Sequence, residues 1–359
     1  MLAYMQSTVA YLGPAGTFTE AAVLKFAARG AFPGTAGAAD TAPETLPLGS
    51  PTEVLDAVRA GRAAFGVIAI ENSVDGPVTQ AFDALAAGEV QIYDELDLDI
   101  AFTVMARPGT ALADVRRLAS HPVGYQQVRG WLAAHAPGVE FVPGASNGAA
   151  ARMVAEGEVD AAAAPARAAD LFGLDRLAEG IADVKGASTR FVLVGPPGRP
   201  PARTGRDRTS VAFRLPNTPG TLVGALGEFA QRGVNLTRIA SRPTRELMGT
   251  YVFYADMAGH IDDAPVGEAL RALWLRAEHI AFLGSWPDRT DPGREAAAGG
   301  PDLGRIAAAT RWVDALRAGE AVTDTTAGGA PSDAATDDAA TDDAATDDAA
   351  TDATDEEKK

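Results

Sequence analysis

Two adjacent residues have side chains suited to chemistry on a negatively charged substrate. Thr189 and Arg190 stand at the start of an apolar run that ends at Gly195. A hydroxyl donates or accepts a hydrogen bond, and a guanidinium binds a carboxylate through two parallel hydrogen bonds. A solvent-facing polar start to a strand has the same composition, so the residue types leave both interpretations open.

Three short segments have the glycine or hydroxyl residues that expose the backbone amides of a helix start. They are Gly13-Pro14-Ala15-Gly16-Thr17, Ser146-Asn147-Gly148 and Asn217-Thr218-Pro219-Gly220-Thr221. Unpaired N–H groups at a helix N-terminus attract anions, so each segment is a candidate anion site. Ordinary turns and N-caps have the same residue types as an anion site. For the first two segments, spacing alone favours an ordinary turn or N-cap.

Two further polar segments follow predicted strands. Glu71-Asn72-Ser73 comes directly after the apolar run 66–70, and Ser241-Arg242-Pro243 ends a strand in the last third of the chain. Ligands of α/β proteins usually lie outside the carboxyl ends of such strands. A helix cap with a turn at Asp75-Gly76, or turn chemistry alone, explains the two segments equally well.

The elements that must position these residues alternate between strands and helices. Strands are predicted at 9–13, 66–70 and 191–195, and helices at Thr17, with Glu20 completing a capping box, at Ser50-Pro51 and at 77–86. At least four strand, loop and helix units precede the strand at 191–195. This pattern predicts an α/β domain over residues 1–195.

The next segment is a stiff linker, because four of the six residues 196–201 are proline. It is assigned to 196–208. Strands at 209–216, 234–241, 250–256 and 280–286 and helices at 220–232 and 262–276 then follow in the order βαββαβ. That order predicts a ferredoxin-like domain over 209–287.

Residues 288–359 are assigned to a C-terminal extension. Apolar residues at helical spacing predict a short helix near 302–318. An Ala-Ala-Thr-Asp-Asp repeat follows, which has nothing to bury and is predicted to stay disordered. Of the 48 acidic residues, 13 lie between 320 and 359, where Lys358 and Lys359 are the only bases. The net charge of -17 therefore belongs mostly to the tail.

Composition excludes several classes of function. The chain has no cysteine, and its four histidines, His121, His135, His260 and His279, lack metal-ligand spacing. With four lysines it has no basic stripe for nucleic acid. No apolar stretch is long enough for a membrane span, and no signal peptide is recognised. We expect a cytoplasmic protein without metal or cofactor that acts on small molecules.

Taken together, the motifs resemble those of the prephenate dehydratases, which have a C-terminal ACT regulatory domain. The resemblance covers about 9–286 and rests on three segments in order. They are Tyr11-Leu12-Gly13-Pro14-Ala15-Gly16-Thr17-Phe18-Thr19-Glu20, then Glu71-Asn72-Ser73, and then Asp183 with Thr189-Arg190-Phe191. It implies a cleft between two α/β lobes, similar to type II periplasmic binding proteins, with the chain crossing between the lobes twice.

The resemblance also implies an activity and a set of site residues. The reaction is the decarboxylating dehydration of prephenate to phenylpyruvate in L-phenylalanine biosynthesis, without metal or cofactor. Thr189 is the implied hydrogen-bond donor to the leaving hydroxyl, and Arg190 is the candidate ligand of a substrate carboxylate. The implied substrate-binding set is Thr17, Asn72, Ser73, Ser146 and Phe191, the last of which is expected to pack beneath the strand.

The regulatory half resembles the family in the two segments that form the phenylalanine site between paired ACT domains. These are Gly220-Thr221-Leu222-Val223 and Ser241-Arg242-Pro243. The family usually has glutamate before the second segment, whereas this chain has Ala240. Because such a site needs two chains, the resemblance implies a homodimer or homotetramer with L-phenylalanine as effector.

Two alternatives stay open at this point. One is arogenate dehydratase, which performs the same elimination on the amino-acid analogue, and nothing in the sequence separates the two. The other is a non-catalytic sensor with a binding cleft and an ACT domain. The Thr189-Arg190 pair favours an enzyme, because a sensor has no need of the hydroxyl.

Overall fold

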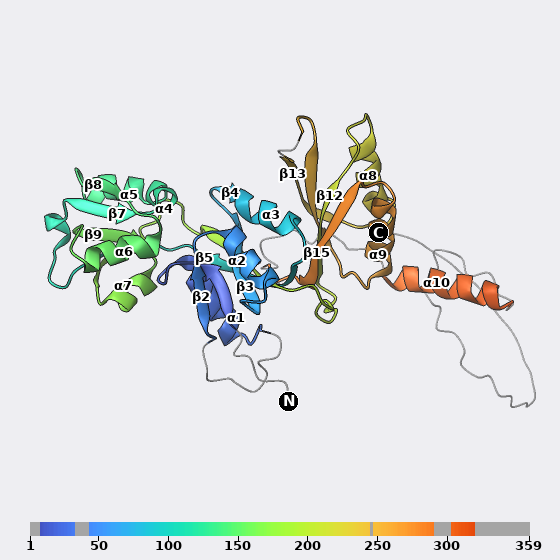
Figure 1. The fold of residues 1–359 in the computed structure, drawn as a ribbon, viewed down its shortest axis with the longest axis horizontal. Coiled ribbons are helices and arrows are strands. Elements are labelled where there is room, and N and C mark those ends of the chain that lie inside the picture. The colour runs from blue at the N-terminus through green and yellow to red at the C-terminus, as the bar shows by residue number, and fades with distance from the viewer. Residues whose placement is uncertain (1–7, 33–42, 245–246, 291–302, 320–359) are drawn as a thin grey trace, which may run out of the picture. The chain divides into compact units, whose positions relative to one another are not determined.

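The structure is a computed structural model that describes residues 8–32, 43–244, 247–290 and 303–319 (Figure 1). The first lobe contains β1 (Val9–Leu12), α1 (Phe18–Ala28), β2 (Thr45–Leu48), α2 (Pro51–Arg59), β3 (Phe65–Asn72), β4 (Gly76–Pro77), α3 (Thr79–Ala86), β5 (Gln91–Asp99) and β11 (Ser188–Gly195). The second lobe contains β6 (Thr103–Ala106), a 3-10 turn (Leu112–Asp114), β7 (Arg117–Ser120), α4 (Pro122–Gln126), α5 (Arg129–His135), β8 (Glu140–Pro143), α6 (Asn147–Ala155), β9 (Ala161–Ala164), α7 (Ala166–Phe172) and β10 (Asp175–Glu179).

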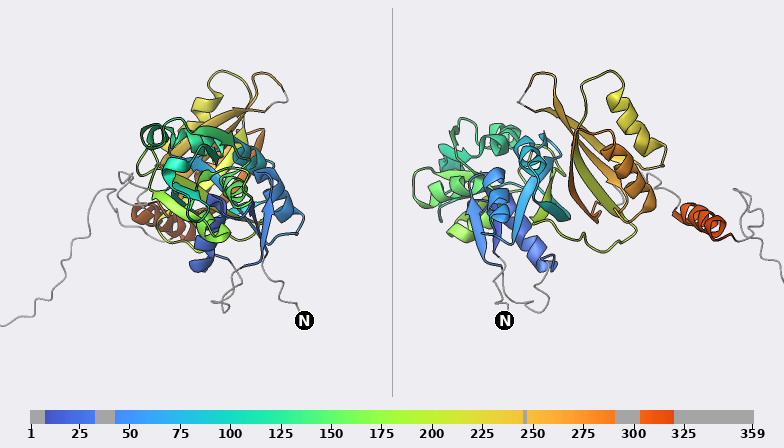
Figure 2. Two further views of the ribbon diagram at one scale, coloured as in Figure 1. Left: turned by 90° about the vertical axis from the view of Figure 1, so that its left-hand side faces the viewer. Right: turned by 45° about the vertical axis from the view of Figure 1, so that its right-hand side comes forward.

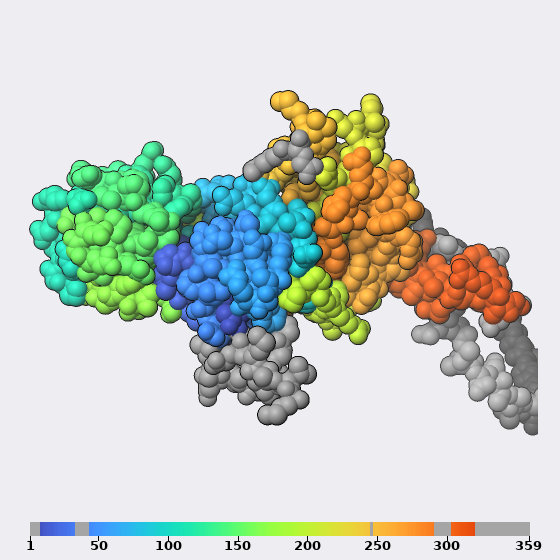
Figure 3. All heavy atoms as spheres, viewed as in Figure 1, coloured from blue at the N-terminus to red at the C-terminus, as the bar shows by residue number. Residues whose placement is uncertain are grey.

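The C-terminal domain contains β12 (Asp207–Arg214), α8 (Thr221–Ala230), β13 (Leu236–Pro243), β14 (Tyr251–Ala258), α9 (Ala264–Trp274) and β15 (His279–Pro287). A separate helix, α10 (Leu303–Ala318), lies where the sequence predicts one near 302–318. In Figures 1 and 3 the first lobe is blue to cyan except for the yellow-green β11, the second lobe is teal to green, and the C-terminal domain is yellow to orange.

The two lobes have the same strand order. It is β2-β1-β3-β11-β5 in the first and β8-β7-β9-β6-β10 in the second. In each, the first three strands are parallel, the fourth pairs antiparallel with the third, and the fifth pairs antiparallel with the fourth. The chain leaves the first lobe after β5 and returns before β11, so it crosses between the lobes twice, as predicted. The start of β11, with Thr189, follows the second crossing directly.

The C-terminal domain is a four-stranded antiparallel sheet in the order β13-β14-β12-β15, and Figure 2 shows its two helices on one face of that sheet. A single parallel pair, Gly284 with Ile92, joins it to β5, so one ten-stranded sheet spans the first lobe and this domain. Its other face contributes Ala212, Tyr254 and Trp286 to a buried cluster with α2 and α3. The domain therefore shares a hydrophobic core with the first lobe.

Local sequence explains the helix starts. Thr17 and Ser50 are N-caps that accept from the N–H of Glu20 and Glu53, respectively. The capping box at Thr17 is only half formed, because the Glu20 carboxylate accepts from Gly16 N at 2.8 Å instead of from Thr17 N. The helix predicted at 77–86 begins at Thr79, since the preceding Gly76–Pro77 pairs with the end of β3.

The two-lobed α/β fold and the βαββαβ domain are confirmed. The residue boundaries assigned to the domains stay predictions, and the repeat tail at 320–359 lies outside the described residues. Within the described ranges, no helix has the length and apolar character of a membrane span. No group of three or more acidic, histidine or cysteine side chains there has the arrangement of a metal site.

Candidate active site

The hydroxyl of Thr189 lies where β11 runs between β3 and β5, opposite Asn72 and Leu98. The Asn72 side-chain amide donates to Thr189 Oγ1 at 2.8 Å. The carbonyl oxygen of the same side chain accepts from the N–H groups of Val74 and Asp75, which fixes which end of the amide faces Thr189. Thr189 Oγ1 accepts this hydrogen bond, so the Thr189 hydroxyl can donate its hydrogen to another acceptor.

Ser73 ties the end of β3 to the start of β11. Its backbone N–H donates to the Ser188 carbonyl and its Oγ accepts from the Ser188 N–H, both at 2.9 Å. Since Ser188 precedes Thr189, these two bonds hold the strand directly beside the Thr189 hydroxyl. The structure thus brings Asn72, Ser73 and Thr189 together, as the sequence predicts.

Arg190 points to the opposite face of the sheet from Thr189, because neighbouring residues of a strand alternate. Its Nε lies 3.2 Å from Asp97 Oδ1 and its Nη1 lies 3.9 Å from Glu71 Oε2. Burial alone would lower the pKa of Arg190, but the negative charges of Glu95 and Asp97 outweigh burial and raise it. The guanidinium is therefore held as a cation between carboxylates of the protein itself.

Phe191 returns to the face of Thr189, where it packs in the core. It is 2% exposed and belongs to the apolar cluster of Tyr11, Phe26 and Leu96. It supports the strand from below.

A pocket of about 470 Å³ opens on the Arg190 side of this strand. Its lining residues are Glu71, Asn72, Ser73, Gly76, Asp97, Ser188, Arg190 and Thr290. Thr290 comes from the segment after β15, which the sequence assigns to the C-terminal extension. The pocket is therefore completed by a residue that follows the C-terminal domain.

The turn before α1 reaches across to the second lobe. Thr17 is buried, and its hydroxyl donates to the Pro14 carbonyl at 3.0 Å. Glu20, one helical turn on, accepts from Gly16 N and from Arg167 Nε of α7 at 2.9 Å. One carboxylate thus links the glycine turn of the first lobe to a helix of the second.

Ser146 is the N-cap of α6, and its Oγ accepts from Ala149 N at 3.0 Å. Two residues later, a Cβ added to Gly148 would lie 2.3 Å from the carbonyl oxygen of Ala15. Only a residue without a side chain permits this approach. The start of α6 and the turn before Thr17 therefore face each other across the two lobes.

A second contact between the lobes joins the loop after Asn72 to α4, where Gln127 Nε2 donates to Asp75 at 2.8 Å. Asp183, part of the third motif, does not line the pocket. Its carboxylate accepts from the N–H groups of Gly130 and Trp131 and so holds the start of α5.

The predicted effector segments lie on different parts of the C-terminal domain. Gly220 has φ of 87° and precedes α8, and the Thr221 hydroxyl donates to the carbonyls of Pro216 and Thr218. Val223 is 74% exposed on this helix, whereas Leu222 packs against the core of the domain.

The second effector segment, Ser241 to Pro243, lies on β13, which is an end strand of the sheet. Arg242 does not point toward α8. Its guanidinium forms two hydrogen bonds, of 2.7 and 3.0 Å, with Asp83 on α3 of the first lobe. Ala240 is on the same side and packs against the shared core. A larger side chain at 240 would enter this contact.

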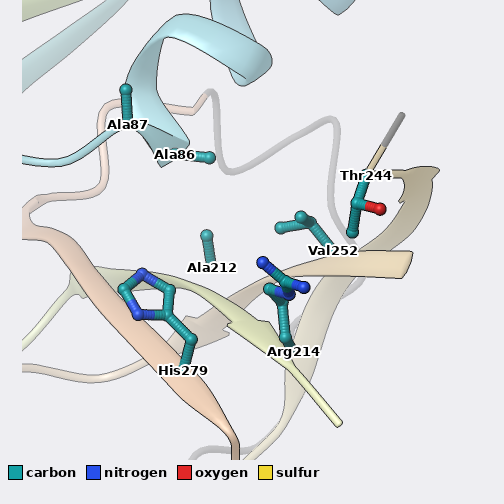
Figure 4. Close-up of a pocket in the computed structure, with 7 residues that line it drawn as sticks. All are labelled: Ala86, Ala87, Ala212, Arg214, Thr244, Val252 and His279. Atoms are coloured by element: carbon teal, nitrogen blue, oxygen red, sulfur yellow. The ribbon is translucent and has the colours of Figure 1, made fainter. Parts of the chain in front are cut away.

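A smaller pocket of about 290 Å³ lies next to it, between the end of α3 and the sheet of the C-terminal domain (Figure 4). Arg214 and His279 project into it from β12 and β15, beside Ala86 and Val252.

The sequence did not predict the buried pair of Glu95 and Arg208, which lies beneath Arg190. Glu95 on β5 is 1% exposed, and Arg208 on β12 is 2% exposed, with Nε 3.5 Å from Glu95 Oε1. Burial raises the pKa of Glu95 to about 7 against the opposing charge of Arg208. The only hint in the sequence is the acidic run 94–99, whose strand partners cannot be read from local pattern.

The fold and these contacts define a class: a two-lobed α/β protein with a polar site at the crossing between the lobes and a ferredoxin-like domain attached to one lobe. The chain belongs to the prephenate dehydratase family. The prephenate dehydratase family model matches residues 9–199, and the ACT domain model matches residues 209–275. The protein is thus an enzyme of this family that carries an ACT regulatory domain.

The chain is similar to individual relatives over most of its length. The chain is 56% identical over 314 residues to the prephenate dehydratase of Corynebacterium glutamicum, covering 87% of this chain and 97% of the relative. A solved prephenate dehydratase from Arthrobacter aurescens in complex with L-Phe has a TM-score of 0.75 at 39% identity, covering 87% and 99% of the two chains. A structure described as a quorum-quenching acylase, GqqA, has a TM-score of 0.68 at 32% identity, covering 80% and 100%.

Proposed function

We propose that the enzyme converts prephenate to phenylpyruvate in L-phenylalanine biosynthesis. The ring carboxylate leaves as carbon dioxide, and the electrons of the broken C–C bond enter the ring as the hydroxyl on the opposite carbon leaves with a proton as water. Formation of the aromatic ring supplies the driving force. The protein must position the substrate and assist departure of the hydroxyl.

The hydrogen bond from Asn72 to Thr189 Oγ1 carries this proposal. Because Asn72 fills an acceptor site of the oxygen, the Thr189 proton is directed to another acceptor, as the leaving hydroxyl requires. A threonine hydroxyl is a weak acid, so its contribution is orientation and hydrogen bonding before proton transfer. Thr189 is the proposed catalytic residue.

The remaining cleft residues are proposed to bind the dianionic substrate. Thr17 and Ser146 stand at the starts of α1 and α6, where the helix dipole and N–H groups favour negative charge. Asn72 and Ser73 line the same crossing. Since Arg190 faces the other side of the strand between Asp97 and Glu71, its proposed role is to hold the strand.

We also propose that L-phenylalanine regulates the enzyme through paired ACT domains. The end strand β13 bears Ser241 to Pro243 and offers an edge for a second chain. The relative from Arthrobacter aurescens was solved with L-Phe. A homodimer or homotetramer is the assembly that such a site requires.

The test is an assay of the purified protein on prephenate, followed by phenylpyruvate formation, with and without phenylalanine. For Thr189→Ala we expect kcat to fall roughly 10²- to 10⁴-fold. Thr189→Ser, which keeps the hydroxyl, is the matched control and retains most of the activity. Equal turnover by wild type and Thr189→Ala would show that the catalytic assignment is wrong.

Two other outcomes of this assay would support arogenate dehydratase or a non-catalytic sensor instead. A wild type that is inert on prephenate and active on arogenate is an arogenate dehydratase with the same site. A wild type that binds either compound without turnover is a sensor. Unchanged turnover at saturating phenylalanine would contradict the regulatory proposal alone.

A further inference from the structure

The pocket beside the catalytic strand contains one residue from beyond the ACT domain. Thr290 is 6% exposed, and its Oγ1 accepts from Arg190 Nη2 at 3.4 Å and from Arg208 Nη2 at 2.9 Å. One hydroxyl oxygen therefore lies between a guanidinium of the catalytic strand and a guanidinium of the first ACT strand. Both hydrogen bonds come from cations, which makes the oxygen an acceptor that an apolar side chain cannot replace.

Each of the three guanidinium nitrogens of Arg190 faces a different side chain. Nε faces Asp97, Nη1 faces Glu71 and Nη2 faces Thr290. The first two partners belong to β5 and β3 of the first lobe. Thr290 is the partner that comes from the C-terminal side of the chain, so its contact joins Arg190 to the segment after the last ACT strand.

Thr290 is itself fixed to the ACT domain. Its N–H donates to Asp288 Oδ1 at 2.8 Å, and its carbonyl accepts from Arg206 Nη2. Arg208 Nη2 also donates to Asp288 at 3.2 Å. The segment follows directly on β15, which pairs with β12 up to Pro287, and within it Arg289 N also donates to Glu95 Oε1 of the first lobe at 3.2 Å.

The catalytic hydroxyl is one residue away from this network. Thr189 and Arg190 are neighbours on β11 with side chains on opposite faces, so a rotation of the backbone that moves the guanidinium also moves the hydroxyl. A misplacement of about 1 Å at a reacting group can cost about 10²-fold in rate. A shift of Arg208 and Thr290 is therefore transmitted to Thr189 through a short chain of hydrogen bonds.

We propose that Thr290 is a positioning residue, whose hydroxyl joins Arg208 of the ACT domain to Arg190 and so transmits the state of the ACT domain to the catalytic strand. The inference rests on the proposed function for its kinetic consequence. It assigns to the segment after β15 a role in the site and makes the catalytic strand sensitive to effector binding without a contact between effector and substrate.

The experiment compares Thr290→Val, which keeps the shape and removes the oxygen, with Thr290→Ser, which keeps the oxygen. We expect Thr290→Val to lower kcat about 10-fold with KM changed less than about 2-fold, and to abolish most of the response to phenylalanine. Thr290→Ser should keep the wild-type kcat and the wild-type response to phenylalanine. Thr209→Val removes another buried hydroxyl of the ACT domain, bonded to Gly259 and Ser285, and should leave kcat and phenylalanine response unchanged.

A second readout does not depend on turnover. Amide hydrogen exchange of a peptide covering β11 should be about 3-fold faster in Thr290→Val than in wild type or Thr290→Ser. If wild type is inert on prephenate, the proposed function fails. The exchange measurement still tests whether Thr290 holds β11 through Arg190. Wild-type exchange rates in Thr290→Val, or unchanged kcat and phenylalanine response in an active enzyme, overturn the inference.

Discussion

The first and second lobes share one strand order but have different neighbours. The sheet of the first lobe continues into the ACT sheet through Ile92 and Gly284, whereas the second lobe forms a five-stranded sheet of its own. Contacts that tie the ACT domain to the rest of the enzyme involve α3, β5 and β11 of the first lobe. The second lobe meets the first through Gly148, Gln127 and Arg167.

This difference separates two tasks within one repeated architecture. The second lobe contacts the glycine turn of the first through the start of α6. In the mechanism proposed above, the first lobe carries the catalytic strand and receives the regulatory signal, because that strand is next to the strand joined to the ACT sheet. Three predictions probe this division.

The largest effect is expected where the second lobe approaches the first. Gly148→Ala places a Cβ 2.3 Å from the Ala15 carbonyl oxygen. Because the contacted atom is backbone, the two lobes must separate to make room. We expect kcat/KM to fall about 10²-fold. Gly227→Ala is the matched control on α8, where the nearest atom to the added carbon is 4.0 Å away. Equal kcat/KM in Gly148→Ala and wild type would mean that the active enzyme does not use this contact.

The second effect concerns stability against pH at the junction between the first lobe and the ACT domain. The pKa of Glu95 rises from 4.5 to about 7 on folding because of burial, so the folded state binds the extra proton within that window. Stability therefore falls as pH rises from about 4.5 to about 7, by about 3 kcal/mol, and then levels off. Arg190 and Arg208 are the cations that face this carboxyl.

Urea unfolding at a series of pH values checks this. Glu95→Gln should lose this component of the slope, because the amide does not titrate. Glu140→Gln, an exposed glutamate on β8 of the second lobe, is the matched control and should follow wild type. Parallel curves for wild type and Glu95→Gln would show that Glu95 is not the group responsible.

The smallest effect concerns the effector strand. Asp83→Asn weakens the hold on Arg242, whose guanidinium then becomes available to an effector at β13. We expect the phenylalanine concentration for half inhibition to fall about 2- to 5-fold, the range of a partly exposed ion pair. Asp56→Asn breaks the pair with Arg59 on neighbouring α2 and serves as control. A rise in that concentration would show that Asp83 assists the effector instead of competing for Arg242.

Local sequence predicted the elements and most of the polar set around Thr189. Turn and cap residues such as Thr17, Ser50 and Ser146 determine where helices begin, and apolar runs determine the strands. Their order along the chain was enough to indicate an α/β domain and a βαββαβ domain, whereas the division of the first domain into two lobes came from the family resemblance. These features depend on neighbours within a few residues, which is why the sequence contains them directly.

Tertiary structure decided which face each side chain uses and what meets it there. Arg190 was expected beside Thr189 at the substrate, yet strand alternation places it on the opposite face, between Asp97 and Glu71. Arg242 was assigned to the effector site and is bound to Asp83. Thr290 lay outside every motif and lines the pocket. Such contacts join residues about a hundred positions apart, and strand pairing across the two crossings, invisible to local pattern, brings them together.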